Sequence, residues 1–121
     1  MRVLCADDED DIRTILQLSL SLDPSIEAEV CPSGEALLAR VTDGAWDAVI
    51  LDAMMPGLDG YETCRRLKAD PVTRDIPVVF LSAKTQRQEV SRALEAGAVA
   101  SLEKPFDPLT LVGQLRAAIG R

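Results

Sequence analysis

The chain alternates short apolar runs with longer segments in which apolar residues recur every three or four positions. The short runs are typical of buried strands, and the longer periodic segments are typical of amphipathic helices. Five strands are predicted, at residues 3–6, 26–31, 47–52, 78–81 and 99–102. Four of five predicted helices cover residues 12–22, 61–69, 86–96 and 108–119, and the other follows a capping Ser33 and carries Leu37, Leu38 and Val41. This strict alternation predicts an α/β fold in which helices cover both faces of a parallel sheet.

Two of the predicted strands are patterned differently. Residues 47–52 are apolar between Asp47 and Asp52, which predicts a central strand covered on both faces. Residues 26–31 instead alternate apolar positions with Glu27, Glu29 and Cys31, a pattern typical of a strand at an exposed edge of the sheet. We therefore expect the third strand near the middle of the sheet and the second at its border.

Turn and capping signals mark the ends of the predicted helices. Asp107 is expected to cap the last helix, with Pro108 at its first helical position. The packed face of that helix is predicted to carry Leu109, Val112, Leu115 and Ile119. Gly97 follows the helix at 86–96, as expected of a residue just beyond a helix end. At about 100° per residue, the six apolar residues of the 12–22 helix span an arc of roughly 200°, which is wide for one face. We expect part of this helix to contact a partner.

Length and charge restrict the classes of protein to which the chain can belong. Its 121 residues, 47% of them hydrophobic, are enough for one domain with a core of its own, and we expect a single domain over residues 1–121. The formal net charge is −7, and no run of five basic residues occurs. Direct binding to nucleic acid through its phosphates is therefore not expected.

The cellular location is predicted from the cysteines and from the apolar runs. Cys5, Cys31 and Cys64 are odd in number and widely spaced, so reduced, buried thiols are expected rather than a disulfide framework or a zinc site. No apolar stretch approaches the roughly 20 residues of a membrane span. The first four residues lead directly into a strand and do not resemble a signal peptide. We expect a cytoplasmic protein that does not contact the membrane.

Polar and charged side chains stand at the carboxyl ends of four of the predicted strands. Asp7 and Asp8 follow the first strand, Asp52 ends the third, Ser82 follows the fourth and Lys104 comes just after the fifth. In a doubly wound sheet these strand ends meet at one edge, where ligands bind. Three neighbouring carboxylates repel one another and favour a divalent cation, and we expect Mg²⁺.

The same residues suggest phosphoryl chemistry. A carboxylate can act as a nucleophile and form an aspartyl phosphate. Asp52 is the best candidate because it ends the central strand, whereas Asp7 and Asp8 are adjacent and point in different directions. An aspartyl phosphate needs a fixed cation, a hydroxyl donor and an amine around it, and Ser82 and Lys104 could supply the last two.

Four motifs, in order and at matching intervals, resemble those of the receiver domain of bacterial two-component response regulators. The resemblance extends over essentially the whole chain. The motifs are Ala6-Asp7-Asp8-Glu9, Leu51-Asp52-Ala53-Met54-Met55-Pro56-Gly57-Leu58-Asp59-Gly60, Leu81-Ser82-Ala83 and Glu103-Lys104-Pro105-Phe106. The resemblance implies a flavodoxin-like (βα)5 fold, with five parallel strands in the order 2-1-3-4-5.

The resemblance also implies a role for each site residue. Asp52 would accept a phosphoryl group from the phosphohistidine of a histidine kinase or of a phosphotransfer protein. Mg²⁺, for which Mn²⁺ could substitute, would be bound by Asp8, Asp52 and the Met54 backbone carbonyl, with Asp7 acting nearby or through water. Ser82 would hydrogen-bond the phosphoryl group, and Lys104 would pair with it. The Lys104–Pro105 peptide bond would be cis.

The expected function is signalling by phosphorylation-dependent protein contact. The protein would not be an enzyme beyond self-catalysed phosphoryl transfer and hydrolysis at Asp52. Its expected partners are the kinase and a downstream target or output domain, and the resemblance allows a phosphorylation-dependent dimer. No output domain follows the last predicted helix, so the chain is either a stand-alone regulator or a fragment of a longer protein.

One position departs from the family pattern. The family usually carries an aromatic residue three residues before the lysine, and its rotation reports phosphorylation; here that residue is Ser101. A serine cannot supply the change in buried apolar surface that a rotating ring gives. We therefore expect a phosphorylation signal to pass mainly through the loop after Ser82 and the start of the 86–96 helix.

Three other readings of the sequence are less well supported. A haloacid-dehalogenase-type phosphatase needs an acid two residues after the nucleophile, where Met54 stands, and the chain has no room for a substrate-covering cap. A flavin- or nucleotide-binding module needs a glycine- or hydroxyl-rich loop after the first strand, where the acids at 7–11 would repel a phosphate. An inactive receiver that serves only for docking is disfavoured because all five site residues are present.

Overall fold

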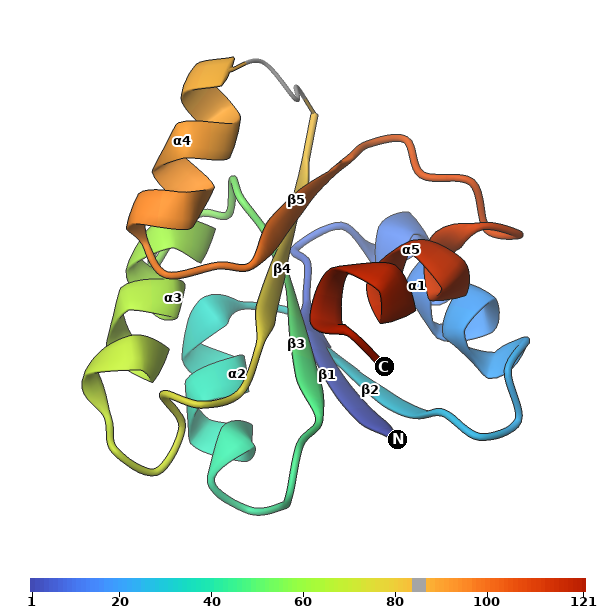
Figure 1. Ribbon diagram of the computed structural model, residues 1–121, viewed down its shortest axis with the longest axis horizontal. Coiled ribbons are helices and arrows are strands. Elements are labelled where there is room, and N and C mark those ends of the chain that lie inside the picture. Colours follow the sequence, from blue (N-terminus) through green and yellow to red (C-terminus); the bar gives the residue numbers. More distant parts are fainter. Residues whose placement is uncertain (84–86) are drawn as a thin grey trace.

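A computed structural model describes residues 1–83 and 87–121, and within these ranges strands and helices alternate along the whole chain (Figure 1). The strands are β1 (Arg2–Ala6), β2 (Glu27–Cys31), β3 (Ala48–Asp52), β4 (Val78–Ser82) and β5 (Ala100–Glu103). The helices are α1 (Asp10–Ser21), α2 (Gly34–Val41), α3 (Gly60–Ala69), α4 (Arg87–Glu95) and α5 (Leu111–Ile119). All five predicted strands are confirmed to within one residue at each end.

The strands form one parallel sheet in the order β2-β1-β3-β4-β5, the flavodoxin-like order that the family resemblance implies. The order reverses between β1 and β3, which are adjacent in the sheet although β2 lies between them in the sequence. Ala6 pairs with Leu51 there, so the residues that follow these two strands emerge side by side. A change of direction of this kind is where open α/β sheets bind ligands.

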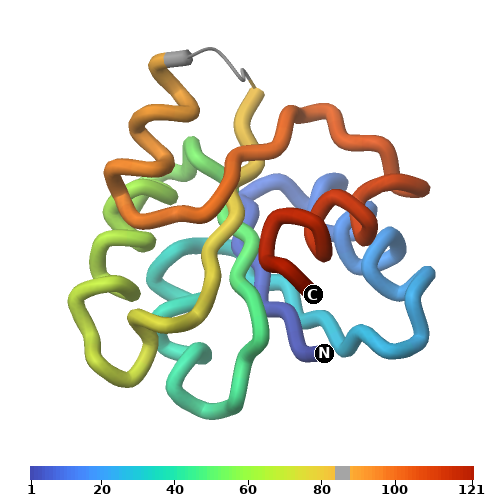
Figure 2. Tube along the Cα trace, in the orientation of Figure 1, coloured from blue at the N-terminus to red at the C-terminus, as the bar shows by residue number. Residues whose placement is uncertain are grey.

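Helices cover both faces of the sheet, as predicted. Figure 1 and Figure 2 show α1 and α5 on one side and α2, α3 and α4 on the other. Every residue of β3 is buried: Val49 and Leu51 belong to the hydrophobic cluster under α2, α3 and α4, whereas Ala48 and Ile50 belong to the cluster under α1 and α5. This alternation confirms the doubly covered central strand. The edge position predicted for β2 is also confirmed.

On the α2–α4 side, the cap predicted at Ser33 is confirmed, and the structure adds a second cap at Asp59. The Ser33 hydroxyl accepts a hydrogen bond from the Ala36 N–H at 3.0 Å and so caps α2. The Asp59 carboxylate accepts one from the Glu62 N–H at 2.9 Å and caps α3. Gly97 has a φ of +105° just beyond α4, which confirms its predicted place after the helix end. The predicted start of this helix at Gln86 lies outside the described residues.

The start predicted for α5 is wrong. The Asp107 carboxylate accepts a hydrogen bond from the Leu109 N–H at 2.8 Å, and its carbonyl accepts one from the Thr110 N–H at 3.1 Å. These bonds close a turn, so the helix begins at Leu111 rather than at Pro108. Leu109 is 82% exposed and does not lie on the packed face of the helix.

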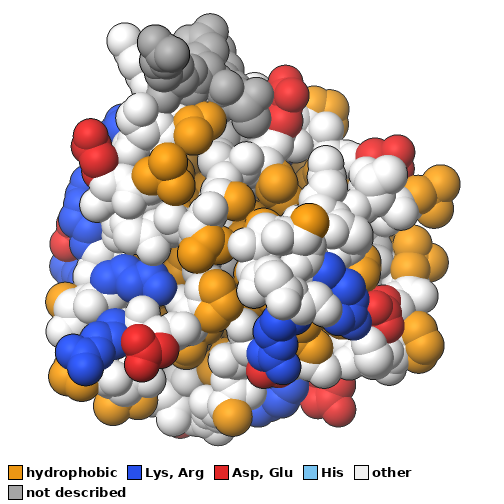
Figure 3. Space-filling view, viewed as in Figure 1, with side chains coloured by type: hydrophobic (Ala, Val, Ile, Leu, Met, Phe, Trp, Pro, Cys, Tyr) orange, Lys and Arg blue, Asp and Glu red, His pale blue; other side chains and the backbone are white. Residues whose placement is uncertain are grey.

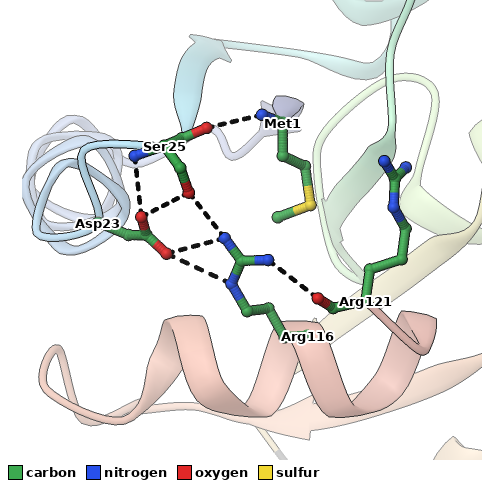
Figure 4. Close-up of polar contacts among 5 residues, drawn as sticks. All are labelled: Met1, Asp23, Ser25, Arg116 and Arg121. Atoms are coloured by element: carbon green, nitrogen blue, oxygen red, sulfur yellow. Dashed lines mark hydrogen bonds and ion pairs between the residues drawn. The ribbon is translucent and has the colours of Figure 1, made fainter.

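The chain termini are tied together at the amino ends of the strands, as Figure 2 and Figure 4 show. The Arg116 guanidinium of α5 donates hydrogen bonds at 2.9 Å to both the Asp23 carboxylate and the Ser25 hydroxyl. The Met1 amino group donates to the Ser25 carbonyl at 2.6 Å. The hydrogen bonds of Asp23 with Ser25 and Arg116 lower the pKa of Asp23 to about 2. The end of α5 is thereby anchored to the start of the sheet.

Surface and core features agree with the predicted class of protein. On the described part of the face shown in Figure 3, acidic and basic side chains are interspersed and form no continuous basic surface. Cys5, Cys31 and Cys64 are buried free thiols, as predicted. Among the residues that the structure describes, no helix has the length and hydropathy needed to cross a membrane. The apolar arc of α1 leaves Ile15, Leu18 and Leu22 exposed, which agrees with its predicted excess width.

Candidate functional site

Three carboxylates meet where the strand order reverses. Asp7 follows β1, Asp8 comes next to it, and Asp52 is the last residue of β3. One carboxylate oxygen from each residue lies within 4.8 Å of those of the other two. Asp7 is fully buried and Asp52 is 5% exposed, whereas Asp8 is exposed to solvent. The acidic cluster predicted from the sequence is thus assembled at the carboxyl edge of the sheet.

The backbone around Asp7 is fixed from three sides. Its N–H donates to the Cys31 carbonyl at the end of β2, at 3.1 Å. Its carboxylate accepts a hydrogen bond from the Glu9 N–H at 2.9 Å. Its carbonyl accepts one from the Arg13 guanidinium of α1 at 2.8 Å. The polypeptide that presents the two adjacent acids is therefore held between β2 and α1.

Lys104 brings a cation into the acidic cluster. Its Nζ lies 2.9 Å from Asp7 Oδ2 and 3.4 Å from Asp52 Oδ1. The Lys104 backbone N–H donates to the Ser82 carbonyl at 2.7 Å, which places the lysine beside the end of β4. The Lys104–Pro105 peptide bond is cis, as the family resemblance implies.

The electrostatics of the site follow from burial and close charges. Burial, and then the neighbouring charge of Asp7, raise the pKa of Asp52 to about 6, against the opposing effect of Lys104. Burial would lower the pKa of Lys104, but its hydrogen bonds and charge contacts with Asp7 and Asp52 outweigh this effect, and its pKa is raised. Lys104 is therefore charged at neutral pH, and Asp52, with a pKa of about 6, loses its proton between acidic and neutral pH.

The donor atoms fit a divalent cation. Carboxylate oxygens are hard ligands of the kind that Mg²⁺ prefers. When ionised, the three acids carry three negative charges, and Lys104 offsets only one of them. A doubly charged cation at the exposed, Asp8 side of the cluster would neutralise the rest.

A cavity opens in front of Asp52. Six of its seven lining residues belong to the four family motifs, and the seventh is Ile12 of α1. It is lined by Glu9, Ile12, Asp52, Met54, Ala83, Lys104 and Pro105. Ile12 was not predicted as a site residue, although it lies close in sequence to Asp7 and Asp8, and this adjacency was the signal that could have identified it.

Met54 and Ser82 complete the group of predicted residues at this edge. The Met54 N–H donates to Asp52 Oδ1 at 3.3 Å, while its side chain is exposed. Ser82, the last residue of β4, is 5% exposed. Together with Ala83 and Glu89 they line a second cavity, which shares Met54 and Ala83 with the first. Every site residue predicted from the sequence therefore lies at the same end of the sheet.

Comparison with known proteins gives the same picture. The family model described as "Response regulator receiver domain" matches residues 3–116. The phosphate regulon transcriptional regulatory protein PhoB of Pseudomonas aeruginosa is 37% identical over 121 residues, which cover 98% of this chain and 52% of PhoB. Response regulator PleD of Caulobacter vibrioides is 37% identical over 116 residues, 96% of this chain and 25% of PleD. The chain thus spans about half of the first relative and a quarter of the second.

Solved structures resemble the whole domain. Chemotaxis protein CheY4 of Vibrio cholerae superposes with a TM-score of 0.90 at 28% identity, and the match covers 97% of both chains. The receiver domain of Francisella response regulator 1452 superposes with a TM-score of 0.87 at 27% identity and covers 99% of this chain and 97% of that one. From the family match, the strand order and the place of its acidic cluster, we conclude that this chain belongs to the response regulator receiver domain family.

Proposed function

We propose that the domain accepts a phosphoryl group on Asp52 in a Mg²⁺-dependent reaction and signals through protein contacts that depend on this modification. The observation that carries the proposal is the cluster of the Asp7, Asp8 and Asp52 carboxylates, with Lys104 Nζ 3.4 Å from Asp52. A carboxylate nucleophile beside a fixed ammonium group and a site for a cation is the arrangement that phosphoryl transfer requires.

The transfer step uses groups that are already in place. An Asp52 oxygen attacks phosphorus, an O–P bond forms, and the P–N bond to the donor histidine breaks, with its electron pair returning to the imidazole. Lys104, now paired with Asp7 and Asp52, would bind a phosphoryl oxygen through the same ammonium. Ser82, buried at the end of β4, would donate its hydroxyl to another oxygen. Water would later hydrolyse the aspartyl phosphate, so the domain modifies itself and is not an enzyme with a separate substrate.

Asp7, Asp8, Asp52 and the Met54 backbone carbonyl are the proposed metal ligands, with Asp7 acting directly or through water. A bound Mg²⁺, or Mn²⁺ in its place, neutralises charge on the carboxylates and on the transferred phosphoryl group. The exposure of Asp8 supports this assignment, because it leaves one face of the cluster open to a hydrated cation.

The proposed partners are a histidine kinase or phosphotransfer protein and a downstream target or output domain. PhoB is named as a transcriptional regulatory protein and MtrA of Mycolicibacterium smegmatis as a DNA-binding response regulator, and the chain covers about half of each. A DNA-binding or other output for this protein would lie outside residues 1–121. The buried free thiols support a cytoplasmic location, where cysteines stay reduced.

The proposal is tested by intact-mass measurement after incubation with acetyl phosphate and MgCl₂. One added phosphoryl group is expected on the wild-type chain and none on Asp52→Asn. Asp75→Asn, a change of the same chemistry at an exposed residue outside the cluster, should accept phosphate as the wild type does. Full phosphorylation of Asp52→Asn would refute the assignment.

A further inference from the structure

Tyr61 links three elements on the α2–α4 side of the sheet. It is the second residue of α3 and is almost completely buried. Its ring stacks on Phe80 of β4, with centroids 5.1 Å apart. Its hydroxyl donates a hydrogen bond to the Glu89 carboxylate of α4 at 2.9 Å, and the Arg92 guanidinium of α4 lies over the ring at 4.1 Å. Burial and the bond to Glu89 raise the pKa of Tyr61 to about 12, so the hydroxyl keeps its proton.

The start of α3 is also packed against the phosphoacceptor segment. Gly60, the residue before Tyr61, has no room for a side chain: a Cβ there would lie 2.3 Å from the Asp52 carbonyl oxygen and 2.9 Å from the Phe80 ring. The Gly60 N–H donates to the Ala53 carbonyl at 3.1 Å. Tyr61 is thus connected through a single residue to the backbone that carries Asp52.

Glu89 reaches toward the same site from the other direction. It lines a cavity together with Met54, Ser82 and Ala83, and this cavity adjoins the one that contains Asp52. The carboxylate that holds the Tyr61 hydroxyl is therefore placed to respond to a change of charge on Asp52.

Ser101 does not provide an aromatic contact between the sheet and α4, and Tyr61 provides it instead. Ser101 pairs with Phe80 in the parallel register of β4 and β5, so the two side chains lie on the same face of the sheet. The Ser101 hydroxyl is buried and has no hydrogen-bond partner among the residues that the structure describes. The aromatic contact with α4 observed on this face is made by Tyr61 instead.

We propose that the Tyr61–Glu89 hydrogen bond holds α4 in its unmodified position and that a phosphoryl group on Asp52 weakens this bond and releases α4. The inference rests on the proposed phosphorylation of Asp52. An aspartyl phosphate carries about −1.5 to −2 charges, as other phosphorylated residues do, in place of the single charge of the ionised carboxylate. Asp52 therefore becomes more negative by up to about one charge and repels a carboxylate that faces the adjoining cavity. Repulsion gives the two positions of α4 different energies, and so it shifts their populations.

Two variants test the Tyr61 hydroxyl and the Glu89 charge separately. Tyr61→Phe keeps the buried ring and removes the hydroxyl. Glu89→Gln keeps an oxygen that can accept the hydrogen bond and removes the charge. The readout is the backbone amide chemical shifts of α4, measured for each protein with and without beryllofluoride and Mg²⁺, a non-covalent mimic of the aspartyl phosphate. Glu95→Gln, at the exposed end of the same helix, is the matched control.

The two variants are expected to place the α4 amide shifts at opposite ends of the range between the unmodified and the beryllofluoride-bound wild type. Without beryllofluoride, the α4 amides of Tyr61→Phe should already lie toward their positions in the beryllofluoride-bound wild type. In Glu89→Gln they should stay near the unmodified positions after beryllofluoride is added. In both variants the beryllofluoride-induced shift over α4 should shrink by at least about two-fold, a change in the state populations that these spectra resolve. Glu95→Gln should match the wild type.

Unchanged α4 shifts in both variants, together with normal responses of Ala53 and Lys104, would overturn the Tyr61–Glu89 link and leave the proposed function intact. An absence of any beryllofluoride response at Ala53 and Lys104 in the wild type would instead overturn the proposed function, and the link with it.

Discussion

Asp7 and Asp8 are adjacent in the sequence, yet their side chains occupy different environments. Asp7 is buried and pairs with Lys104 at 2.9 Å. Asp8 is exposed, while one of its oxygens still lies within the cluster. A buried carboxylate already neutralised by an ammonium group binds a further cation less readily than a solvated one. We therefore propose separate roles for the two neighbours, with Asp8 as the better candidate for direct contact with a metal.

Asp8→Ala is expected to abolish most of the stabilisation that Mg²⁺ gives. Mg²⁺ bound only to the folded protein should raise the melting temperature by an amount that grows with its concentration relative to its dissociation constant. Thermal unfolding at increasing MgCl₂ measures this effect for the wild type and the variant. Asp11→Ala, an exposed acid in the first turn of α1, is the control and should keep the response. An unchanged Mg²⁺-dependent shift in Asp8→Ala would exclude Asp8 as a ligand.

Asp52 should make the metal-free protein less stable as the pH rises. Its pKa is raised from 3.8 to about 6 in the folded state, so between these values the folded protein binds more protons than the unfolded chain. The stabilisation is complete below about pH 4 and is lost as the pH rises through about 6. The pKa difference corresponds to about 3 kcal/mol.

The measurement is urea unfolding in EDTA from pH 4 to 7 for the wild type and for Asp52→Asn, which does not titrate at this position. Other carboxylates titrate in both proteins, so the difference between their free energies of unfolding isolates Asp52. As the pH rises from 4 to 7, the free energy of unfolding of the wild type should fall relative to that of Asp52→Asn. A flat or opposite trend would mean that the acid is not perturbed as its burial requires.

At the scale of elements, α3 begins in a space that admits only glycine. Gly60 lies against the Asp52 carbonyl and the Phe80 ring, and this contact sets how closely α3 approaches the end of β3. The same contact positions Tyr61 for its hydrogen bond to α4. The close packing of Gly60 thus connects the acidic cluster to α3 and, through Tyr61, to α4.

Gly60→Ala is expected to destabilise the domain, whereas Gly113→Ala is expected to stabilise it. A Cβ at Gly60 would lie 2.3 Å from a backbone oxygen, and such overpacking costs about 1–3 kcal/mol. Gly113 lies within α5, with nothing within 4 Å of a Cβ, so alanine there should add about 0.5–1 kcal/mol through its helix propensity. Chemical denaturation of the two variants measures both signs. Equal effects would contradict the close packing at Gly60.

At the scale of the whole molecule, the two ends of the sheet carry different groups of residues. The carboxyl edge gathers the acids, the lysine and the two cavities beside Asp52 and Ser82. The amino edge holds Trp46, the termini and the ion pairs of Asp23 with Arg116 and of Asp47 with Arg121. Charges that change at one edge are separated from the other by the length of the strands.

Trp46 should therefore report poorly on the site. It lies two residues before β3 begins and six residues before Asp52, a separation of up to about 20 Å at about 3.3 Å per residue. It is buried, and the Arg2 guanidinium lies 4.2 Å from its ring. Its fluorescence should change little when Mg²⁺ is added at concentrations that saturate the shift in melting temperature. Strong quenching at those concentrations would contradict the proposed location of the metal site.

Much of the fold was determined by local pattern. The all-apolar third strand and the alternating second strand predicted their central and edge positions, because burial on one or two faces dictates which positions must be apolar. The α5 start was predicted wrongly, because Asp107 can cap a helix or close a turn, and the sequence carries the same signal for both. The wide apolar arc predicted that the sheet does not bury all of the 12–22 helix, and the structure identifies Leu18 and Leu22 as exposed.

For the site, the sequence by itself determined which residue types stand at the strand ends, since strand boundaries and motif spacing are local properties of the chain. Only the tertiary structure decided that Asp7 rather than Asp8 is buried against Lys104, because that choice depends on how β1 and β5 lie across the sheet. It also decided that Tyr61 reaches Glu89, 28 residues later, since α3 and α4 become neighbours only when they pack on the same face. Long-range contacts of this kind depend on shape and burial, which no single segment of the sequence contains.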